Sequence, residues 1–123
     1  MIKGMGVDLV TIERIEKIVK RHPERFLKRI FSAAELKSLE ANLLYPATVA
    51  ARFAAKEAVL KAIGCGIGPA ALNEVEIIAP SGAQPQVYLH GTARRLAAEK
   101  GIDGFALSMT HEPPFACAVA AAY

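Results

Sequence analysis

The segment 46–64 constrains the fold of this chain most, because it reads as one long helix that carries a carboxylate on an apolar face. Pro46 is well placed for the first turn of a helix, and Gly64 for its end. At 3.6 residues per turn, Phe53 and Leu60 lie over or beside Glu57. We therefore predict that the Glu57 side chain is partly buried. A buried carboxylate is costly when unpaired, so it normally finds a cation, a metal or hydrogen-bond donors.

Two interpretations of Glu57 follow from this segment. Lys61 lies four residues further along, so the two side chains could form an ion pair on the helix surface, worth roughly 0.3–0.5 kcal/mol. Alternatively, Glu57 belongs to a functional site whose other residues lie elsewhere in the chain. The segment alone leaves both interpretations open.

The remaining sequence predicts an α+β fold, with one compact domain over residues 1–123 and an antiparallel sheet packed against the long central helix. A chain of 123 residues, 53% hydrophobic and 22% charged, suits a single core and argues against disorder. Pro23 breaks or restarts the first helix, and a capping box from Ser32 to Glu35 opens a later one. The expected strands are 2–9, 75–79, 86–90, 105–111 and 115–122, and the expected helices are 12–21, 32–44, 46–63 and 92–101.

Turns and glycines refine this prediction. Turns are expected at Pro80-Ser81-Gly82 and at Glu112-Pro113-Pro114, and Thr92 is expected to cap the helix that follows it. Gly4 and Gly6 share one face of the first strand. Another backbone or a ligand could approach that face closely.

Several classes of protein are disfavoured by composition. No apolar run approaches the roughly 20 residues that a membrane helix needs. The first eight residues include two glycines and an acid where a signal peptide would have its apolar stretch, so a cytoplasmic protein is expected. Cys65 and Cys117 lack the spacing of a metal site, and we predict reduced thiols. The net charge of +3 is too weak by itself to indicate nucleic acid.

A local excess of basic residues marks the helix 12–21 and the segment after it. Residues 13–29 include seven basic and three acidic side chains. Arg14, Lys17 and Arg21 line one helix face, which could be a solvated surface, a dock for an acidic protein or a contact for RNA. RNA is the weakest of the three, because no aromatic side chains interleave with these bases.

Asp8, Glu57, Lys61 and His111 are the candidate site residues. Taken singly, Asp8 could cap the helix that follows it, and His111 could hydrogen-bond to backbone. Taken together, the four supply two hard oxygen ligands, a cation that suits phosphate and a polar ring. That set suits a phosphorylated ligand with magnesium. The loop 64–69 has three glycines, which could bring backbone N–H groups up to phosphate.

Three motifs resemble those of the bacterial holo-acyl-carrier-protein synthases, the small class of 4'-phosphopantetheinyl transferases. They are Gly6-Val7-Asp8, Phe53-x-x-Lys56-Glu57-Ala58-x-x-Lys61-Ala62-x-Gly64 and Ser108-x-Thr110-His111. The likeness spans nearly the whole chain, and the central motif is far more specific than a lone glycine pattern. It implies the fold of these transferases. It also implies their reaction, in which the phosphopantetheine arm of coenzyme A passes to a serine of acyl carrier protein and adenosine 3',5'-bisphosphate is released, in support of fatty acid biosynthesis.

The resemblance also implies roles in catalysis. Asp8 and Glu57 would bind Mg²⁺, Lys61 would contact phosphate, and His111 would lie near the pyrophosphate. A water on the magnesium ion, or Glu57 acting through that water, could take the serine proton, and both options stay open.

Further roles concern the two substrates. Gly64 and Gly66 would let coenzyme A approach. Arg14, Lys17 and Arg21 would meet the acidic recognition helix of the carrier protein. Three residues depart from the commonest family forms: Leu60, Cys65 and Gln84. We expect no hydroxyl contact to coenzyme A from Leu60 or Cys65, and one phosphate contact fewer at Gln84.

Members of this family usually assemble as homotrimers with active sites between neighbours. The apolar segment 115–122 is a plausible contact for such a trimer, and it could equally be core. Two other classes stay open: a noncatalytic module that binds carrier protein or nucleotide, and a trimeric scaffold. Only the transferase predicts magnesium-dependent consumption of coenzyme A.

Overall fold

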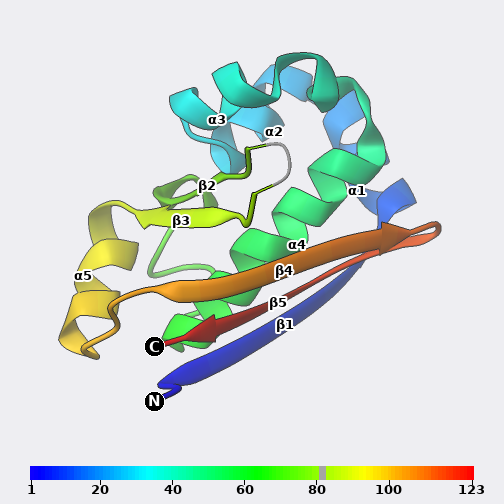
Figure 1. Cartoon of the computed structure of the whole chain (residues 1–123). Coiled ribbons are helices and arrows are strands. Elements are labelled where there is room, and N and C mark those ends of the chain that lie inside the picture. Colours follow the sequence, from blue (N-terminus) through cyan, green and yellow to red (C-terminus); the bar gives the residue numbers. More distant parts are fainter. Residues whose placement is uncertain (81–82) are drawn as a thin grey trace.

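The protein is described by a computed structural model that covers residues 1–80 and 83–123. Its central element is the predicted long helix, α4 (Pro46–Ile63), which lies between a three-stranded sheet and a second layer of shorter helices and strands (Figure 1). Twelve residues of α4 are buried. Pro46 stands in the first turn, and Gly64 closes the helix with a left-handed backbone at φ 89°, as predicted.

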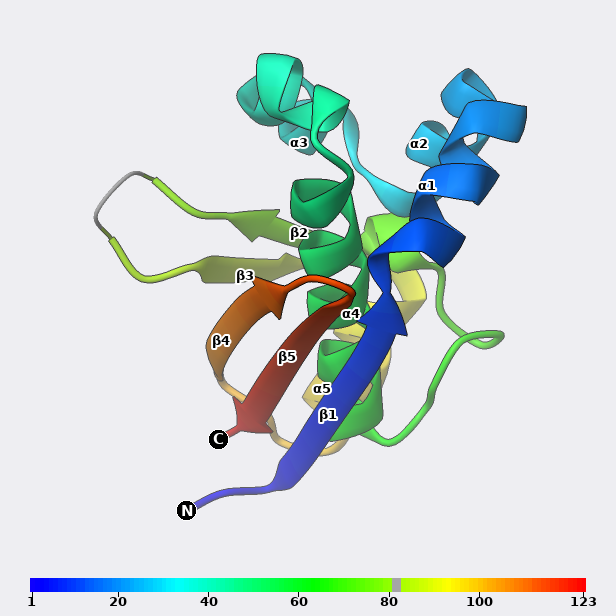
Figure 2. The same ribbon diagram turned by 90° about the vertical axis from the view of Figure 1, so that its right-hand side faces the viewer.

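The larger sheet is antiparallel, with strand order β1-β5-β4. It consists of β1 (Gly4–Thr11), β4 (Phe105–Glu112) and β5 (Phe115–Ala122). The last two form the predicted hairpin, whereas β1 begins and ends two residues later than the predicted strand 2–9. Figure 2 looks towards these strands, with α4 behind them.

The apolar C-terminal segment, for which core and subunit contact were both left open, forms strand β5. Its even-numbered alanines, from Ala116 to Ala122, are buried against α4 and belong to the core. Its odd-numbered residues face away from α4, and among them Phe115 and Val119 are 45% and 41% exposed. The strand is therefore core on one face and open apolar surface on the other.

Strand β1 packs directly on the backbone of α4. A Cβ atom added to Gly4 would collide with the carbonyl group of Ala62, and one added to Gly6 would collide with that of Ala58. The predicted close approach of another backbone is thus confirmed. Its consequence for the site is that Asp8, two residues after Gly6 on the same face, lies alongside α4.

The second layer surrounds the other sides of α4. It consists of α1 (Ile12–Arg21), α2 (Pro23–Ile30), α3 (Ala33–Leu39), η1 (Glu40–Leu44), η2 (Leu72–Glu74), β2 (Val75–Ile78), β3 (Gln86–Leu89) and α5 (Gly91–Glu99). Pro23 starts α2, and Ser32 with Glu35 forms the predicted capping box, with Glu35 N donating to Ser32 Oγ at 3.2 Å. Strands β2 and β3 pair antiparallel. The turn predicted at Ser81 and Gly82 lies outside the described residues.

Two of the predicted helices have different boundaries in the structure. The helix predicted over 32–44 ends at Leu39 and continues as the separate 3-10 helix η1. The prediction that Thr92 caps α5 is wrong, because the helix already begins at Gly91. The N–H of Thr92 instead donates to Glu74 Oε2 at 2.7 Å, so a carboxylate from η2 satisfies this end of the helix.

Two further predictions concern the chain as a whole. Throughout the two ranges that the structure describes, every helix is too short or too polar to cross a membrane. Cys65 and Cys117 are both free thiols, as predicted.

Candidate functional site

Asp8 and Lys61 meet where β1 lies against α4. Lys61 Nζ donates to Asp8 Oδ1 at 3.1 Å and to the Val7 carbonyl oxygen at 3.0 Å. The Asp8 side chain is only 14% exposed, whereas that of Lys61 is 48% exposed. The alternative in which Asp8 caps a helix is wrong, because β1 continues to Thr11, and Thr11 precedes α1. The ion pair of Lys61 is with Asp8 and not with Glu57.

Glu57 is partly buried, as predicted, and belongs to the same cluster. Burial raises the pKa of Glu57, and the negative charge of Asp8 raises it further. Lys61 and Arg14 act in the opposite direction on this pKa, since their positive charges favour the carboxylate. Two acidic side chains therefore approach each other between two basic ones.

The second carboxylate oxygen of Asp8 lacks a partner. Among the side-chain atoms of the described residues, Asp8 Oδ2 is buried and accepts no hydrogen bond. Such an atom is costly unless something binds it. A hard divalent cation shared with Glu57 would bind this oxygen and reduce the repulsion between the two carboxylates.

The donor set decides which cation fits. The described part of the chain offers no group of three or more His, Cys, Asp or Glu side chains that could enclose a metal. Mg²⁺ is commonly bound by one or two carboxylates and completes its shell with water and substrate phosphate oxygens. Asp8 and Glu57 fit that ion, and they fit it best when a phosphorylated substrate is present.

His111 lies apart from this cluster within one chain. It is exposed near the end of β4, level with Ala116 of β5, whereas Asp8 is level with Ala118 of the same strand. Because β5 runs between β1 and β4, the backbones of Asp8 and His111 are separated by two strand spacings and two residues along the sheet, about 12 Å. The structure thus groups Asp8, Glu57 and Lys61, and leaves His111 at a distance.

In the glycine loop after α4, backbone N–H groups already donate hydrogen bonds to the end of the helix. The N–H groups of Gly64, Cys65 and Gly66 all point to the Leu60 carbonyl oxygen, at 3.0, 3.2 and 3.4 Å. They satisfy the last turn of α4, which is the negative end of the helix dipole. These N–H groups are therefore not directed at a phosphate. At Gly66, the space that a Cβ would take is open.

The predicted basic face lines a shallow groove beside the β4–β5 turn. Arg14, Lys17 and Arg21 from α1 form one wall, and Pro114 contributes to the other. Lys17 pairs with Glu13 at 2.9 Å on the exposed surface, so part of the positive charge is offset. The positive charge of Arg14 also acts on Glu57, where it opposes the rise in the pKa of that carboxyl group.

Sequence analysis missed the polar partners of Lys56, which precedes Glu57. Lys56 and Glu35 are both 0% exposed, and their charged atoms are 2.6 Å apart. Burial lowers the pKa of Lys56 to about 8, while Glu35 opposes this shift. The capping box identified Glu35 only as a helix-start residue, and no local pattern indicates a partner 21 residues away.

Comparison with known families and proteins shows which family the chain matches over nearly its whole length. The model of the 4'-phosphopantetheinyl transferase superfamily matches residues 4–120. A holo-[acyl-carrier-protein] synthase from Moorella thermoacetica is 44% identical over 115 residues, which cover 94% of this chain and 89% of that protein. One from Desulforudis audaxviator is 45% identical over 122 residues, covering 99% of this chain and 93% of that protein.

Solved structures give the same result for the fold. A Plasmodium yoelii acyl carrier protein synthase with ADP bound has a TM-score of 0.89 and 33% identity, with 99% of this chain and 95% of that chain covered. A Helicobacter pylori holo-[acyl-carrier-protein] synthase in complex with coenzyme A has a TM-score of 0.83 and 31% identity, with 97% and 99% covered. The predicted α+β fold, with an antiparallel sheet against a long helix, is confirmed.

Proposed function

This chain belongs to the holo-[acyl-carrier-protein] synthases of the 4'-phosphopantetheinyl transferase superfamily, and from this premise we propose how its own residues carry out the reaction. The reaction moves the 4'-phosphopantetheine arm of coenzyme A to a serine hydroxyl of apo-acyl carrier protein. The bond broken is within the pyrophosphate, and adenosine 3',5'-bisphosphate leaves. In such phosphoryl transfer the protein chiefly positions the reactants and offsets negative charge.

The observation that carries the proposal is the cluster of Asp8, Glu57 and Lys61. Asp8 presents a buried oxygen without a partner. Glu57 is a second acid, whose pKa is raised by burial and by the negative charge of Asp8. These two carboxylates would hold Mg²⁺. When bound, the ion would neutralise charge on the pyrophosphate oxygens.

Lys61 is the phosphate-binding residue of the proposal. Its ammonium group is half exposed while anchored to Asp8 and the Val7 carbonyl, so it is held in place and still accessible to a ligand. Glu57 acting through a water molecule, or that water itself, would accept the serine proton. Gly66 offers an open backbone surface for coenzyme A, and Gly64, beside the Lys100 ammonium group, would lie next to it.

Residues outside this cluster would bind the carrier protein and form the contacts between subunits. Arg14, Lys17 and Arg21 would dock the acidic carrier protein in the groove along α1. The exposed apolar face of the larger sheet, with Met5, Val7, Leu9, Phe115 and Val119, would be covered in a homotrimer.

An assembly would also explain the position of His111. The backbone of this residue lies about 12 Å from that of Asp8, across two strand spacings and two residues along the sheet. A site formed between neighbouring copies could bring His111 of one chain to the pyrophosphate held by another. The two free thiols suit the reducing cytoplasm, where we place the reaction.

The direct test follows the leaving group. Purified protein, coenzyme A and apo-acyl carrier protein are incubated with Mg²⁺ or with a chelator, and adenosine 3',5'-bisphosphate is quantified. We expect release that depends on Mg²⁺ and on carrier protein, and we expect Asp8→Asn to reduce it by about 10²-fold or more. Release that persists with the chelator would remove the metal from the proposal.

A further inference from the structure

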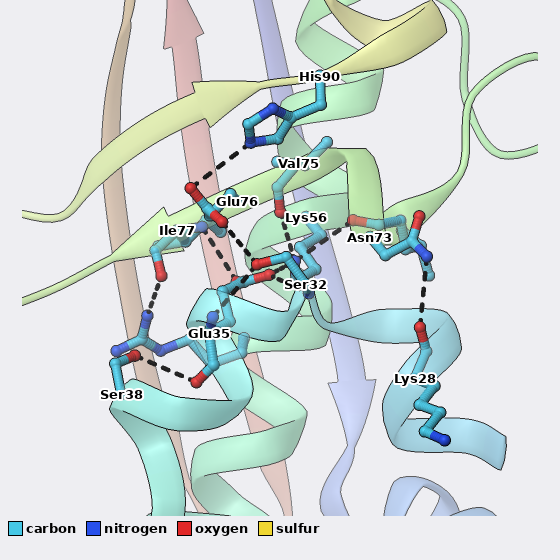
Figure 3. A network of polar contacts seen from close by, with 12 residues as sticks. Lys28, Ser32, Glu35, Ser38, Lys56, Asn73, Val75, Glu76, Ile77 and His90 are labelled. Carbon is cyan, nitrogen blue, oxygen red and sulfur yellow. Dashed lines mark hydrogen bonds and ion pairs between the residues drawn. The ribbon is translucent and has the colours of Figure 1, made fainter. Parts of the chain in front are cut away.

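The buried Glu35–Lys56 pair is the core of a polar network that joins four segments (Figure 3). Lys56 on α4 donates to Glu35 Oε1 on α3, to the Leu72 carbonyl oxygen of η2 at 3.3 Å and to the Val75 carbonyl oxygen of β2. Glu35 Oε2 in turn accepts the N–H of Ile77 at 3.0 Å. The three donors of the ammonium group thus all have acceptors.

Additional contacts restrict the two side chains further. The Lys56 ammonium lies 5.3 Å from the centroid of the Phe31 ring. The N–H of Ser32 donates to Glu35 Oε1 at 3.0 Å, and its hydroxyl donates to Glu76 Oε1 at 2.7 Å. Every bond in this network has a direction, so the network specifies positions as well as contacts.

Stability alone is a weak reason for such a pair. Taking two charges out of water is costly, and replacing a buried ion pair by apolar residues of similar volume is often neutral or stabilising. The pair also contacts or neighbours the buried apolar residues Phe31, Leu72 and Ile77, so apolar side chains could fill its place. The directional bonds of the pair therefore call for an explanation beyond burial.

The packing of α4 supplies one. Six of its twelve buried residues are alanines, and buried residues lie on most sides of the helix. Towards β1 the helix packs through Ala58 and Ala62 against Gly6 and Gly4, and such small residues give few ridges that would resist rotation of the helix about its axis. Lys56 is the charged side chain of α4 that is fully buried, and its bonds to α3, η2 and β2 do resist such a rotation.

Glu57 follows Lys56 directly, about 100° further around the same helix. Lys56 faces the layer of α3 and β2, whereas Glu57 lies one helical turn before Lys61, which pairs with Asp8 of β1. Any rotation of α4 moves both side chains together. Because a misplacement of about 1 Å can cost 10²-fold in rate, the rotation of α4 is a property that the reaction depends on.

We propose that the buried Glu35–Lys56 pair sets the rotation of α4 and thereby positions Glu57 opposite Asp8. Lys56 and Glu35 are positioning residues, since neither reaches the cluster itself. The inference rests on the function proposed above and adds a second layer of residues to it.

The test uses the neutral double variant Glu35→Gln/Lys56→Met, which leaves no single charge buried. Thermal unfolding is measured first, followed by the affinity for coenzyme A with and without Mg²⁺ and by the steady-state rates with carrier protein. We expect the double variant to unfold within a few degrees of the wild type. We also expect it to lose about 10- to 100-fold in kcat and in the Mg²⁺-dependent part of the coenzyme A affinity, with KM for carrier protein unchanged.

Ile77→Val is the matched control, because it removes one methyl group from the same buried layer and leaves the pair intact. It should unfold slightly earlier than the wild type and keep wild-type rates and affinity. A double variant with wild-type kcat and wild-type Mg²⁺-dependent affinity would overturn the inference. A loss in Ile77→Val as large as in the double variant would also overturn it.

Two further arms complete the experiment. Where the double variant does not fold, Glu35→Asp replaces it, since this change keeps the charge and shortens the side chain by one methylene. Loss of kcat and affinity in a folded Glu35→Asp supports the inference, and wild-type values overturn it. Absence of transferase activity in the wild type would instead contradict the proposed function, and the Mg²⁺-dependent binding of coenzyme A would then decide the inference alone.

Discussion

Glu57 is held in an unfavourable electrostatic setting, which is typical of a residue selected for chemistry more than for stability. Its burial and the nearby Asp8 both raise its pKa. In the absence of metal the carboxylate therefore destabilises the fold, and protonation relieves this. The pKa of Glu57 is higher in the folded state than in the unfolded state, so protonation of Glu57 favours the folded state. This contribution to the free energy of unfolding is present at low pH and is lost as pH rises through the folded-state pKa.

Glu57→Gln should separate these two effects. We expect transferase activity to fall by about 10²–10³-fold, since the variant loses a carboxylate ligand. The free energy of unfolding at neutral pH, measured by denaturant titration without metal, should not fall, and any rise should stay below about 1 kcal/mol because solvent screens the partly exposed Glu57. This difference from the wild type should shrink as pH is lowered towards the pKa of Glu57. Wild-type activity in the variant would contradict the role of Glu57.

Arg21 offers the cleanest probe of the basic groove. Arg14 influences Glu57 directly, whereas Arg21 stands at the end of α1 and lines only the groove. We expect Arg21→Ala to raise KM for carrier protein about 2- to 5-fold at low salt, equivalent to ~0.5–1 kcal/mol, with kcat unchanged. Arg25→Ala, an exposed change on α2, is the control. Equal effects of the two changes at every salt concentration would indicate a general charge effect and no specific dock.

Helices and strands were predictable where their ends are determined locally. Pro46 and Gly64 bound α4 correctly because proline fixes φ at a helix start and glycine adopts the left-handed end. The β4–β5 hairpin followed from its alternation and its prolines. Thr92 failed as a cap because a distant carboxylate, Glu74, performs that task.

The candidate site was only partly predictable for the same reason. The motifs identified Asp8, Glu57 and Lys61, but the pairing of Lys61 with Asp8 depends on β1 lying against α4, a contact between segments 53 residues apart. The buried partner of Lys56 is equally non-local. Sequence spacing within one helix indicates its own neighbours and carries no information on which other element packs there.

Ser32 tests how much a local cap contributes to the second layer. Its hydroxyl accepts the N–H of Glu35 and donates to Glu76, so Ser32→Ala removes a cap and a second hydrogen bond. We expect a loss of about 1–2 kcal/mol in the free energy of unfolding, measured in urea. Ser38→Ala, which removes one hydroxyl contact from the same helix, should cost less. Equal losses would contradict the capping role.

The molecule as a whole presents one unusual surface, the apolar outer face of the larger sheet. Met5, Val7 and Leu9 of β1 are each about 60% exposed or more, next to Phe115 and Val119 of β5. Exposed apolar patches of this kind mark interaction sites. A homotrimer that buries this face would also bring residues of neighbouring chains to each site.

Val7→Lys should therefore shift the assembly towards monomers and reduce transferase activity with it. The measurement is sedimentation velocity across a range of concentrations, combined with the transfer rate. Tyr45→Lys is the control, because Tyr45 is 62% exposed but lies at the start of α4, away from this face. An active wild-type monomer would contradict the assembly, and a trimer that persists in Val7→Lys would contradict the use of this face.

The central claim is that Asp8 and Glu57 form the site of a magnesium-dependent phosphopantetheinyl transfer. The most direct test is the mass of purified apo-acyl carrier protein after incubation with coenzyme A and this protein, with and without Mg²⁺. We predict that the carrier protein gains the mass of one phosphopantetheine only when Mg²⁺ is present, and that Glu57→Gln largely abolishes this gain. An unchanged mass in the presence of Mg²⁺, with coenzyme A nevertheless bound, would contradict the account and favour a binding module.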